Sequence, residues 1–462
     1  MIIFAAFDTL WHMNIIVAGI GEVGTHLATK LSKSTHRVMA IDQDPANLQR
    51  LNEQADLGTL LGSATSIPIL QKAEVGHTDL FIAVAHAETT NIIAALLAKK
   101  LGASRVIARI DTNEYLEQEN KRLLKDMGID TLIYPEKLAS QVVIGMLGET
   151  GTSEMVDFSD GRLVFSTLQI DNDTPFAGQT LEAIAKRPWH DDYRIAAIAR
   201  MGQTIIPRGY DTLLPGDNIY VISTKRGIEE WRRQLGGEHF QVNSLIVVGA
   251  SRIGIRTCLD LEGKVKSIKL IENDPEKCRT LRPHLHRTLL LNGDGRDTDF
   301  LIEEGLDSAD AFVSVTGDSE TNILTSMAAK RAGAKQIIAE VENFNYISLA
   351  ESIGIDNVIN KKLVAASYIY RYTMEGGVID MRYLSGTDAE VVEFEAQSNS
   401  LATRSRLKDL NFPRNSIAGG VIHDGKASIA TGDTIIEPGD RVVVFALGSA
   451  LQKLEKFFKK NG

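Results

Sequence analysis

Hydrophobic and polar positions alternate along the chain in blocks that predict parallel strands separated by helices. Ile15 to Gly19 is a continuous apolar run, as is typical of a strand buried on both faces. A helical pattern follows over 21–31, and a second apolar strand runs over 37–42. Further segments predicted in this way are helices over 45–52 and 89–101 and strands over 57–62, 79–85 and 105–110. This alternation predicts a parallel sheet with helices on both faces.

The chain contains this pattern twice. After its first strand, the first copy reads Gly19-Ile-Gly21-Glu22-Val23-Gly24, and the second reads Gly249-Ala-Ser251-Arg252-Ile253-Gly254. Asp42 ends the next strand in the first copy and Glu272 ends it in the second. Gly249, Gly254 and Glu272 each lie 230 positions after Gly19, Gly24 and Asp42. Repetition at this scale indicates a duplicated domain.

A smaller segment rich in predicted strands follows each copy. The turn Pro215-Gly-Asp217 precedes the last strand of the first such segment, and Pro438-Gly-Asp440 precedes that of the second. We therefore predict an α/β protein with two Rossmann-like doubly wound parallel sheets, each followed by a small α+β domain. The predicted domains span residues 13–136, 150–234, 243–365 and 378–460.

The glycine-rich turn of the first copy predicts a dinucleotide site. Gly19 permits the tight turn, Gly21 lets the backbone approach a pyrophosphate, and Gly24 lets the helix pack on the strand. The helix N-terminus, with Glu22 and Val23 in its first turn, offers free N–H groups and a positive dipole to phosphates. Asp42 is placed to accept hydrogen bonds from an adenosine ribose. The alternative is a Rossmann-like domain that has lost its ligand.

The second copy departs from this pattern. Ser251 replaces the middle glycine, so a side chain either crowds the pyrophosphate or donates its hydroxyl proton to it. Glu272 is a longer acid than Asp42. An altered or empty site is a stronger alternative here than in the first copy.

Residues at the carboxyl ends of the later strands complete the candidate sites, because ligands bind at that edge of such a sheet. They are Gly62, Ser63, Ala85 and Arg109 in the first copy, and Gly293, Asp294 and Thr316 in the second. Arg109 is suited either to a phosphate or to pairing with an acid across an interface. Its counterpart is Glu340, so the two sites differ in charge.

The surroundings of Asp42 indicate which nucleotide the first site binds. No arginine stands beside Asp42 for a 2′-phosphate, so the sequence favours NAD(H) over NADP(H). ATP and ADP share the adenosine and diphosphate and are candidates for the same or the second cleft.

Composition removes several other classes. The net charge of −10 and the lack of a long basic tract argue against a nucleic-acid partner. Cys258 and Cys278 form no CxxC pair, and no metal site is expected. No apolar run approaches the roughly 18–20 residues of a membrane-spanning helix. Met13 directly precedes the first strand, and we expect the native start there.

With these motifs in order, the chain resembles the regulator-of-potassium-conductance (RCK) family. The resemblance rests on the doubled glycine-rich turn, the segments Ala87 to Asn91 and Asp318 to Asn322, the strand at Ile107 to Arg109 and the Pro-Gly-Asp turns. The doubled arrangement is similar to the peripheral subunit of Trk-type bacterial potassium uptake systems. The resemblance implies a cytoplasmic, non-enzymatic nucleotide sensor. It further implies a homotetrameric ring on the inner face of a potassium-conducting membrane subunit, with NAD(H), ATP or ADP biasing its shape.

Two other classes remain open from the residues. One is an NAD-dependent dehydrogenase with a duplicated domain, although no large substrate domain separates the two copies. The other is a regulator of a different cation transporter.

Overall fold

The computed structural model describes residues 13–34, 36–148, 154–159, 161–170, 172–200, 203–235, 242–355, 357–374, 377–384 and 389–460. Residues 1–12, which precede the start expected at Met13, lie outside these residues. The chain divides into two compact units, one formed by the described part of Met1–Leu138 with Lys361–Thr373, and the other by the described parts of Ala139–Asn360 and Met374–Gly462.

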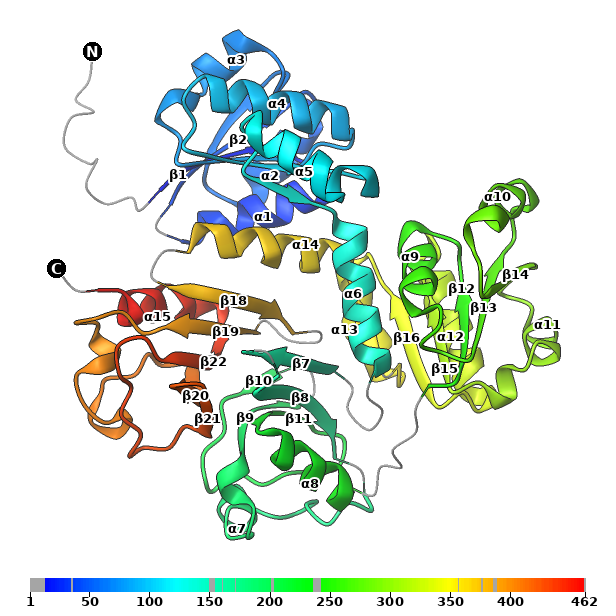
Figure 1. Ribbon diagram of the computed structural model, residues 1–462, viewed down its shortest axis with the longest axis vertical. Helices are drawn as coiled ribbons and strands as arrows, with labels where there is room; N and C mark the ends of the chain where they lie inside the picture. Colours follow the sequence, from blue (N-terminus) through cyan, green and yellow to red (C-terminus); the bar gives the residue numbers. More distant parts are fainter. Residues whose placement is uncertain are drawn as a thin grey trace. The chain divides into compact units, whose positions relative to one another are not determined.

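The first copy, drawn in blue and cyan in Figure 1, forms a parallel sheet. Its six strands follow the order β3-β2-β1-β4-β5-β6. Its strands are β1 (Asn14–Ala18), β2 (Arg37–Asp42), β3 (Gly58–Leu61), β4 (Leu80–Ala83), β5 (Arg105–Arg109) and β6 (Thr131–Ile133). The sequence pattern predicted the first five. The sixth has only three residues, which is too short for an alternating pattern to reveal.

The helices of this copy lie between the strands. They are α1 (Glu22–Ser32), α2 (Pro45–Gln54), α3 (Ile67–Lys72), α4 (Glu88–Lys100) and α5 (Gln118–Asp126). Gly102, at φ +114°, follows α4 in the left-handed conformation that only glycine adopts easily. A buried core of aliphatic side chains and Phe81 fills the space between sheet and helices.

The second copy repeats this sheet in the order β14-β13-β12-β15-β16-β17. Its strands are β12 (Ser244–Val248), β13 (Ser267–Glu272), β14 (Thr288–Asn292), β15 (Ala311–Ser314), β16 (Gln336–Glu340) and β17 (Asn357–Ile359). Its helices are α9 (Arg252–Leu261), α10 (Pro275–Leu281), α11 (Thr298–Glu303), α12 (Ser319–Ala332) and α13 (Phe344–Ser352). The predicted pair of Rossmann-like sheets is therefore confirmed.

Each small domain is built on an antiparallel five-stranded sheet, in the orders β10-β9-β11-β8-β7 and β18-β19-β22-β20-β21. The first contains β7 (Glu154–Phe158), β8 (Leu163–Gln169), α7 (Leu181–Ile184), β9 (Tyr193–Arg200), β10 (Gln203–Ile205), β11 (Asn218–Ser223) and α8 (Lys225–Leu235). The second contains β18 (Val378–Tyr383), β19 (Ala389–Glu395), β20 (Ser416–His423), β21 (Lys426–Ile429), β22 (Arg441–Leu447) and α15 (Leu451–Phe458).

The two small sheets share one hydrophobic core. Phe165 of β8 stacks on Phe445 of β22 with ring centroids 6.5 Å apart. Gly419 and Gly420 of β20 make room for the other sheet, because a Cβ at these positions would meet the side chains of Ile222 and Leu163. Between the sheets, the Arg194 guanidinium donates to the Ala430 carbonyl at 3.0 Å.

The helix after each parallel sheet packs on the other copy. Helix α14 (Lys361–Tyr370) follows the second sheet but lies along α1 within the first unit (Figure 1). There Lys30 Nζ lies 4.7 Å from the centre of the Tyr370 ring. Helix α6 (Pro135–Gly148) follows the first sheet but contacts α9 of the second copy. The hydroxyl oxygens of Ser140 on α6 and Thr257 on α9 lie 3.2 Å apart. The copies thus exchange helices.

Within the described residues, no helix combines the length and apolar character needed to cross a bilayer.

Candidate functional site

Two glycines of the first turn are required by the fold itself. Gly19 has φ +96°, and a Cβ there would lie 2.4 Å from the Ala85 amide nitrogen. A Cβ on Gly24 would lie 1.9 Å from the Gly19 carbonyl oxygen. In the second copy a Cβ on Gly249 would lie 2.8 Å from the Thr316 amide nitrogen, and one on Gly254 would lie 2.2 Å from the Gly249 carbonyl oxygen. These glycines let the strand, turn and helix close tightly.

The middle position of the turn is different. A Cβ on Gly21 would meet no atom within 4 Å, so packing does not require glycine there. The open space in front of the N-terminus of α1 is where a pyrophosphate would approach. In the second copy Ser251 stands at this position and caps α9, with its Oγ accepting from the Gly254 amide at 3.2 Å.

Asp42 is held against the turn by backbone donors. Its two carboxylate oxygens accept from the amides of Ile20 and Asp44, at 2.5 Å and 2.8 Å. The Asn47 side-chain amide lies 3.4 Å away and is neutral. The carboxylate thus sits at the carboxyl end of β2, beside the turn, where a ribose-binding acid is needed.

Glu272 occupies the same place in the second copy with an added cation. Its carboxylate accepts from the amides of Ala250 and Asp274, each at 3.1 Å, and from Lys277 Nζ at 2.8 Å. Burial alone would raise the pKa of Glu272, but the bonds from Lys277 and from these amides outweigh it and lower the pKa. The acid at this position in the second copy is therefore ionised and paired with a cation of its own domain.

An asparagine fixes the far side of each site. Asn91 accepts from the Ala85 amide at 2.7 Å and donates to the carbonyls of Ala85 and Arg109, at 2.9 Å and 3.0 Å. Asn322 makes the same contacts with Thr316 and Glu340. Each buried amide ties the ends of two neighbouring strands together, which explains why the segments around Asn91 and Asn322 repeat in the sequence.

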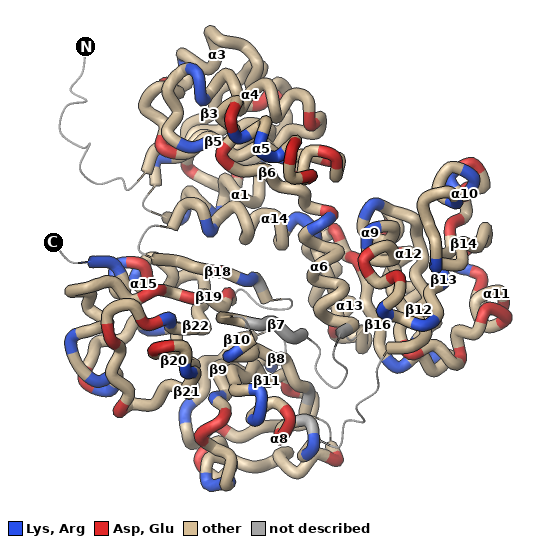
Figure 2. Tube along the Cα trace, viewed as in Figure 1, with Lys and Arg blue, Asp and Glu red and all other residues tan. Residues whose placement is uncertain are grey.

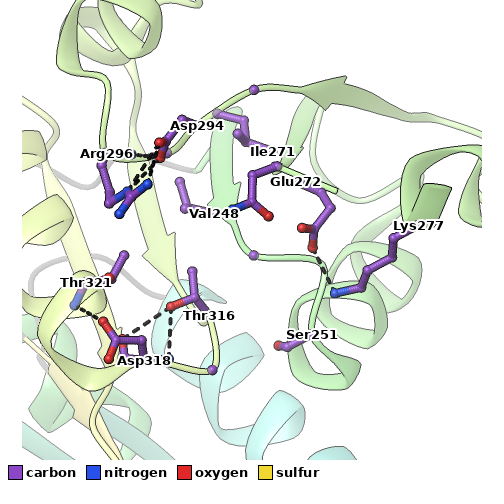
Figure 3. A pocket seen from close by; sticks show the side chains of 15 residues that line it. Val248, Ser251, Ile271, Glu272, Lys277, Asp294, Arg296, Thr316, Asp318 and Thr321 are labelled. Atoms are coloured by element: carbon purple, nitrogen blue, oxygen red, sulfur yellow. Dashed lines mark hydrogen bonds and ion pairs between the residues drawn. The ribbon is translucent and has the colours of Figure 1, made fainter. Parts of the chain in front are cut away.

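In the second copy these elements surround a cleft of about 360 Å³ at the carboxyl ends of β12, β13, β14 and β15 (Figure 3). Six predicted residues line it, namely Gly249, Ser251, Glu272, Gly293, Asp294 and Thr316. Arg252, Ile253 and Gly254 do not line it and belong to the first turn of α9. The size is that of a small-molecule site.

The loops that follow β3 and β14 contain similar hydrogen bonds but differ in charge. In the first copy the Ser63 and Thr65 hydroxyl oxygens lie 2.9 Å apart, and Ser63 Oγ accepts from the Thr65 amide. In the second copy Asp294 accepts from the Arg296 amide at 2.9 Å, and the Arg296 guanidinium pairs with its carboxylate at 2.8 Å (Figure 3). The Arg296 hydrogen bond lowers the pKa of Asp294.

Arg109 pairs with acids of its own unit. Its guanidinium lies 3.2 Å from Asp111 and 3.7 Å from Glu136. Its counterpart Glu340 is 1% exposed at the end of β16. The pairing predicted for Arg109 was with an acid across an interface, whereas both of these acids belong to its own unit. Its role towards a phosphate stays a prediction.

Sequence reasoning missed four charged or hydroxyl residues that line the cleft, namely Lys277, Arg296, Asp318 and Thr321. Asp318 caps α12 by accepting from the Thr321 amide at 2.8 Å. Arg296 stands two residues after a predicted ligand, and Lys277 lies in the helix that follows Glu272. Proximity in sequence was thus an available signal for both cations.

Comparison with known proteins gives matches along most of the chain. The TrkA-N domain model matches residues 15–135 and 245–361, and the TrkA-C domain model matches 166–236 and 391–459. A Trk system potassium uptake protein TrkA homolog from Archaeoglobus fulgidus is 32% identical, covering 97% of this chain and 100% of that protein. The TrkA protein of Haemophilus influenzae is 29% identical, with coverage of 97% and 99%.

Solved structures match the fold over nearly the full length. A GsuK RCK domain structure gives a TM-score of 0.60 at 18% identity, covering 98% of this chain and 96% of that chain. A GsuK channel bound to NAD gives 0.60 at 19% identity, covering 98% and 79%. At such identities the likeness concerns architecture.

Proposed function

The chain belongs to the family of Trk system potassium uptake proteins with tandem TrkA-N and TrkA-C domains, as its sequence resemblance predicted, and we propose that it is the nucleotide-sensing regulatory subunit of a potassium uptake system. The observation that carries this proposal is the presence of two nucleotide-type sites in a single chain of this family. A single binding site would serve many enzymes, whereas paired sites without a substrate domain suit a sensor.

The ligands proposed are adenine nucleotides. In the first copy Asp42 is positioned for the ribose, and the open space at Gly21 leaves room for a pyrophosphate. NAD(H) fits these features, and ATP or ADP presents the same adenosine and diphosphate. A related fold has been solved as the GsuK channel bound to NAD. We propose Gly19 to Gly24, Asp42, Gly62, Ser63 and Ala85 as the first site.

Regulation then follows from linkage. A nucleotide shifts a conformational equilibrium only by its difference in affinity for the two states. At the second site, ligand phosphates would compete with Asp294 for the Arg296 guanidinium. At the first site they would meet only the neutral hydroxyls of Ser63 and Thr65, so the two sites respond differently to phosphate charge. The two nucleotides of a pair such as ATP and ADP can therefore bias the protein unequally.

The proposed subunit is not an enzyme. The described residues that line the second cleft include no histidine or cysteine, and its three acids are engaged by Lys277, Arg296 and the Thr321 amide. A general base or nucleophile poised for hydride or acyl chemistry needs a free reactive group. Purified protein with NADH and a panel of carbonyl compounds should show no turnover, and reproducible oxidation would favour the dehydrogenase alternative.

We further propose assembly into a homotetrameric ring. Each Rossmann-like copy exposes apolar side chains at equivalent places, Ile93, Leu123 and Met127 in the first and Leu324, Leu349 and Ile353 in the second, each 38–65% exposed. They lie on α4 and α5 in the first copy and on α12 and α13 in the second, with Met127 and Ile353 as the C-cap residues of α5 and α13. The order of these helices between consecutive parallel strands puts each pair on one sheet face. Closed symmetry buries such faces.

Leu123→Lys tests the ring. A lysine at this exposed position should lower the mass measured by light scattering from that of four chains, with Arg122→Lys on the same helix as the control. A monomeric mass for the unaltered protein at micromolar concentration would refute the ring directly.

The ring would act on the cytoplasmic side of the membrane, docked on a potassium-conducting subunit of Trk type. The decisive test is potassium flux in vesicles that contain this membrane subunit, with and without the protein and with each nucleotide. We expect nucleotide-dependent flux, with ATP and ADP, or NADH and NAD, giving unequal effects. Identical flux under all conditions would refute the regulatory role, whereas an effect on another cation transporter would redirect it.

A further inference from the structure

Three charged positions around the exchanged helices reverse sign between the two copies. The first helical residue after the glycine-rich turn is Glu22 in one copy and Arg252 in the other. The last residue of the fifth strand is Arg109 in one and Glu340 in the other. The register of the sixth strands aligns Ile133 with Ile359, because they pair with these two residues.

That alignment identifies the third reversed position. Glu136 and Lys362 each stand three residues beyond the end of the sixth strand, at the start of α6 and α14. The three positions therefore read acid, base, acid in the first copy and base, acid, base in the second. Figure 2 shows the basic start of α14.

Contacts within the first unit show what these charges meet. The ammonium of Lys362, delivered by α14 from the second half of the chain, forms an ion pair with the Glu22 carboxylate at the start of α1. Lys362 is 7% exposed and Glu22 is 70% exposed in their side chains. Glu136 instead lies 3.7 Å from Arg109 of its own copy.

A different pairing would join like charges. If α6 of a second chain took the place of α14 on α1, its Glu136 would occupy the position of Lys362 and face Glu22. If two second copies exchanged helices, Lys362 would face Arg252. Lys362 is the buried partner of this pair, so a carboxylate in its place would be buried beside the Glu22 carboxylate without a counter-charge, which is costly.

We propose that this reversal of charge selects the helix that sits on α1, so that each first copy accepts α14 and rejects α6. The partner recognised at this face is thus a helix that begins with a lysine, and the acidic start of α6 is excluded by repulsion. Specificity of this kind needs an unfavourable contact in the wrong complex as well as a favourable one in the right complex. Two copies of one ancestral domain in a single chain face this choice directly.

The test uses the full-length chain with a photo-reactive benzoylphenylalanine in place of Lys30, which lies beside Tyr370 of α14. Mass spectrometry of the crosslinked peptides reports which helix lies on α1. The residue of α6 equivalent to Tyr370 is Ile144. A crosslink to Ile144 would therefore report that the wrong helix lies on α1. A denaturing gel separates capture within a chain from capture between chains.

With Glu22 and Lys362 unchanged, we expect capture of α14 within the chain. Glu22→Lys should reduce this capture at least threefold and produce crosslinks to α6 of another chain. Lys362→Glu should reduce capture of α14 without recruiting α6, because Glu22 repels both helices. The double variant Glu22→Lys with Lys362→Glu should restore capture of α14.

The double variant separates recognition by charge from mere packing. If it fails as the single variants do, or if the single variants capture α14 as well as the unaltered protein does, the proposal is wrong. Failure to capture α14 in the unaltered protein would also contradict it. Glu74→Lys, which reverses the exposed pair with Arg37 elsewhere in the first copy, is the matched control and should change nothing. The readout requires neither nucleotide nor membrane subunit, so it is independent of the proposed function.

Discussion

The two nucleotide-type sites share a backbone and differ in the charges that face a ligand. In both, tight glycines close the strand-to-helix turn and a buried asparagine ties two strand ends together. The first site offers an acid held by backbone amides, which is the proposed ribose ligand, and a pair of hydroxyls. The second offers an acid already paired with Lys277 and a loop whose aspartate already holds Arg296.

This difference separates the parts that build a site from the parts that tune it. The repeated residues are those whose loss would disturb the sheet edge. The divergent residues, Asn47 against Lys277 and Thr65 against Arg296, each contact the acid or hydroxyl beside them, and Asn47 also accepts from Arg50. Two sites built in this way are expected to respond to different concentrations or different nucleotides, so that neither duplicates the other.

The largest effect should come from separating the two kinds of glycine in the first turn. Gly24→Ala forces a Cβ against the Gly19 carbonyl and should destabilise the first Rossmann-like domain by about 3 kcal/mol. In Gly21→Ala the added Cβ meets no atom within 4 Å, so the change should cost less than about 1 kcal/mol of stability. It should nevertheless weaken nucleotide binding. Thermal unfolding and calorimetric titration with ADP and NADH check both. Equal destabilisation by the two changes would contradict the assignment of Gly21 to a ligand.

Removal of each ribose acid should have unequal consequences. Asp42→Ala should weaken adenine-nucleotide binding at the first site by about 1–3 kcal/mol, because charged hydrogen bonds to the ribose are lost. Glu272→Ala should cost less than about 1 kcal/mol, since Lys277 already competes for this carboxylate. Calorimetry on both variants, with Asp44→Ala as a control beside the first site, measures the difference. Unchanged affinity in Asp42→Ala would remove the first site from the proposal.

Acid and alkali should act on different copies. Burial, followed by the charges of Lys30 and Lys33, lowers the pKa of His26 in α1 to about 4. The folded state therefore binds fewer protons than the unfolded state, and the first copy loses stability as the pH falls from 6.5 towards 4. Burial raises the pKa of Glu351 in α13 to about 7. Here the folded state binds more protons, so the second copy loses stability as the pH rises from 4.5 through 7.

Each effect should be about 1–2 kcal/mol, because both groups keep partial contact with solvent. Hydrogen exchange of the two sheets as a function of pH measures them separately. His26→Gln should remove the acid limb and Glu351→Gln the alkaline limb. A pH profile that is the same in both sheets would show that these groups do not control it.

The smallest effect should come from releasing the acid of the second site. Lys277→Met removes the ion pair between the Lys277 ammonium and the Glu272 carboxylate. Because the ammonium is partly exposed, the change should tighten nucleotide binding at the second site only about two- to fivefold. The matched change at the first site, Asn47→Met, should leave affinity almost unchanged. Weaker binding in Lys277→Met would instead make the lysine a ligand for phosphate.

The sequence predicted the repeated architecture because each of its signals is local. Apolar runs, a glycine-rich turn and an acid at the end of the next strand all lie within 28 residues in each copy, 15–42 and 245–272. The exchange of α6 and α14 could not be predicted, because α14 buries residues around most of its circumference and its pattern names no partner. Lys277 and Arg296 escaped notice because surface cations are common, and only the folded backbone turns these two towards Glu272 and Asp294.

The core shared by the two small sheets has a consequence for stoichiometry. A chain of half this length would leave the face around Phe165 or Phe445 bare, and could cover it only by meeting a second half at whatever concentration the cell supplied. Joining the halves replaces that dilute encounter with a local concentration in the ~mM range. The two sensors are therefore present in a fixed one-to-one ratio, which the level of expression cannot alter.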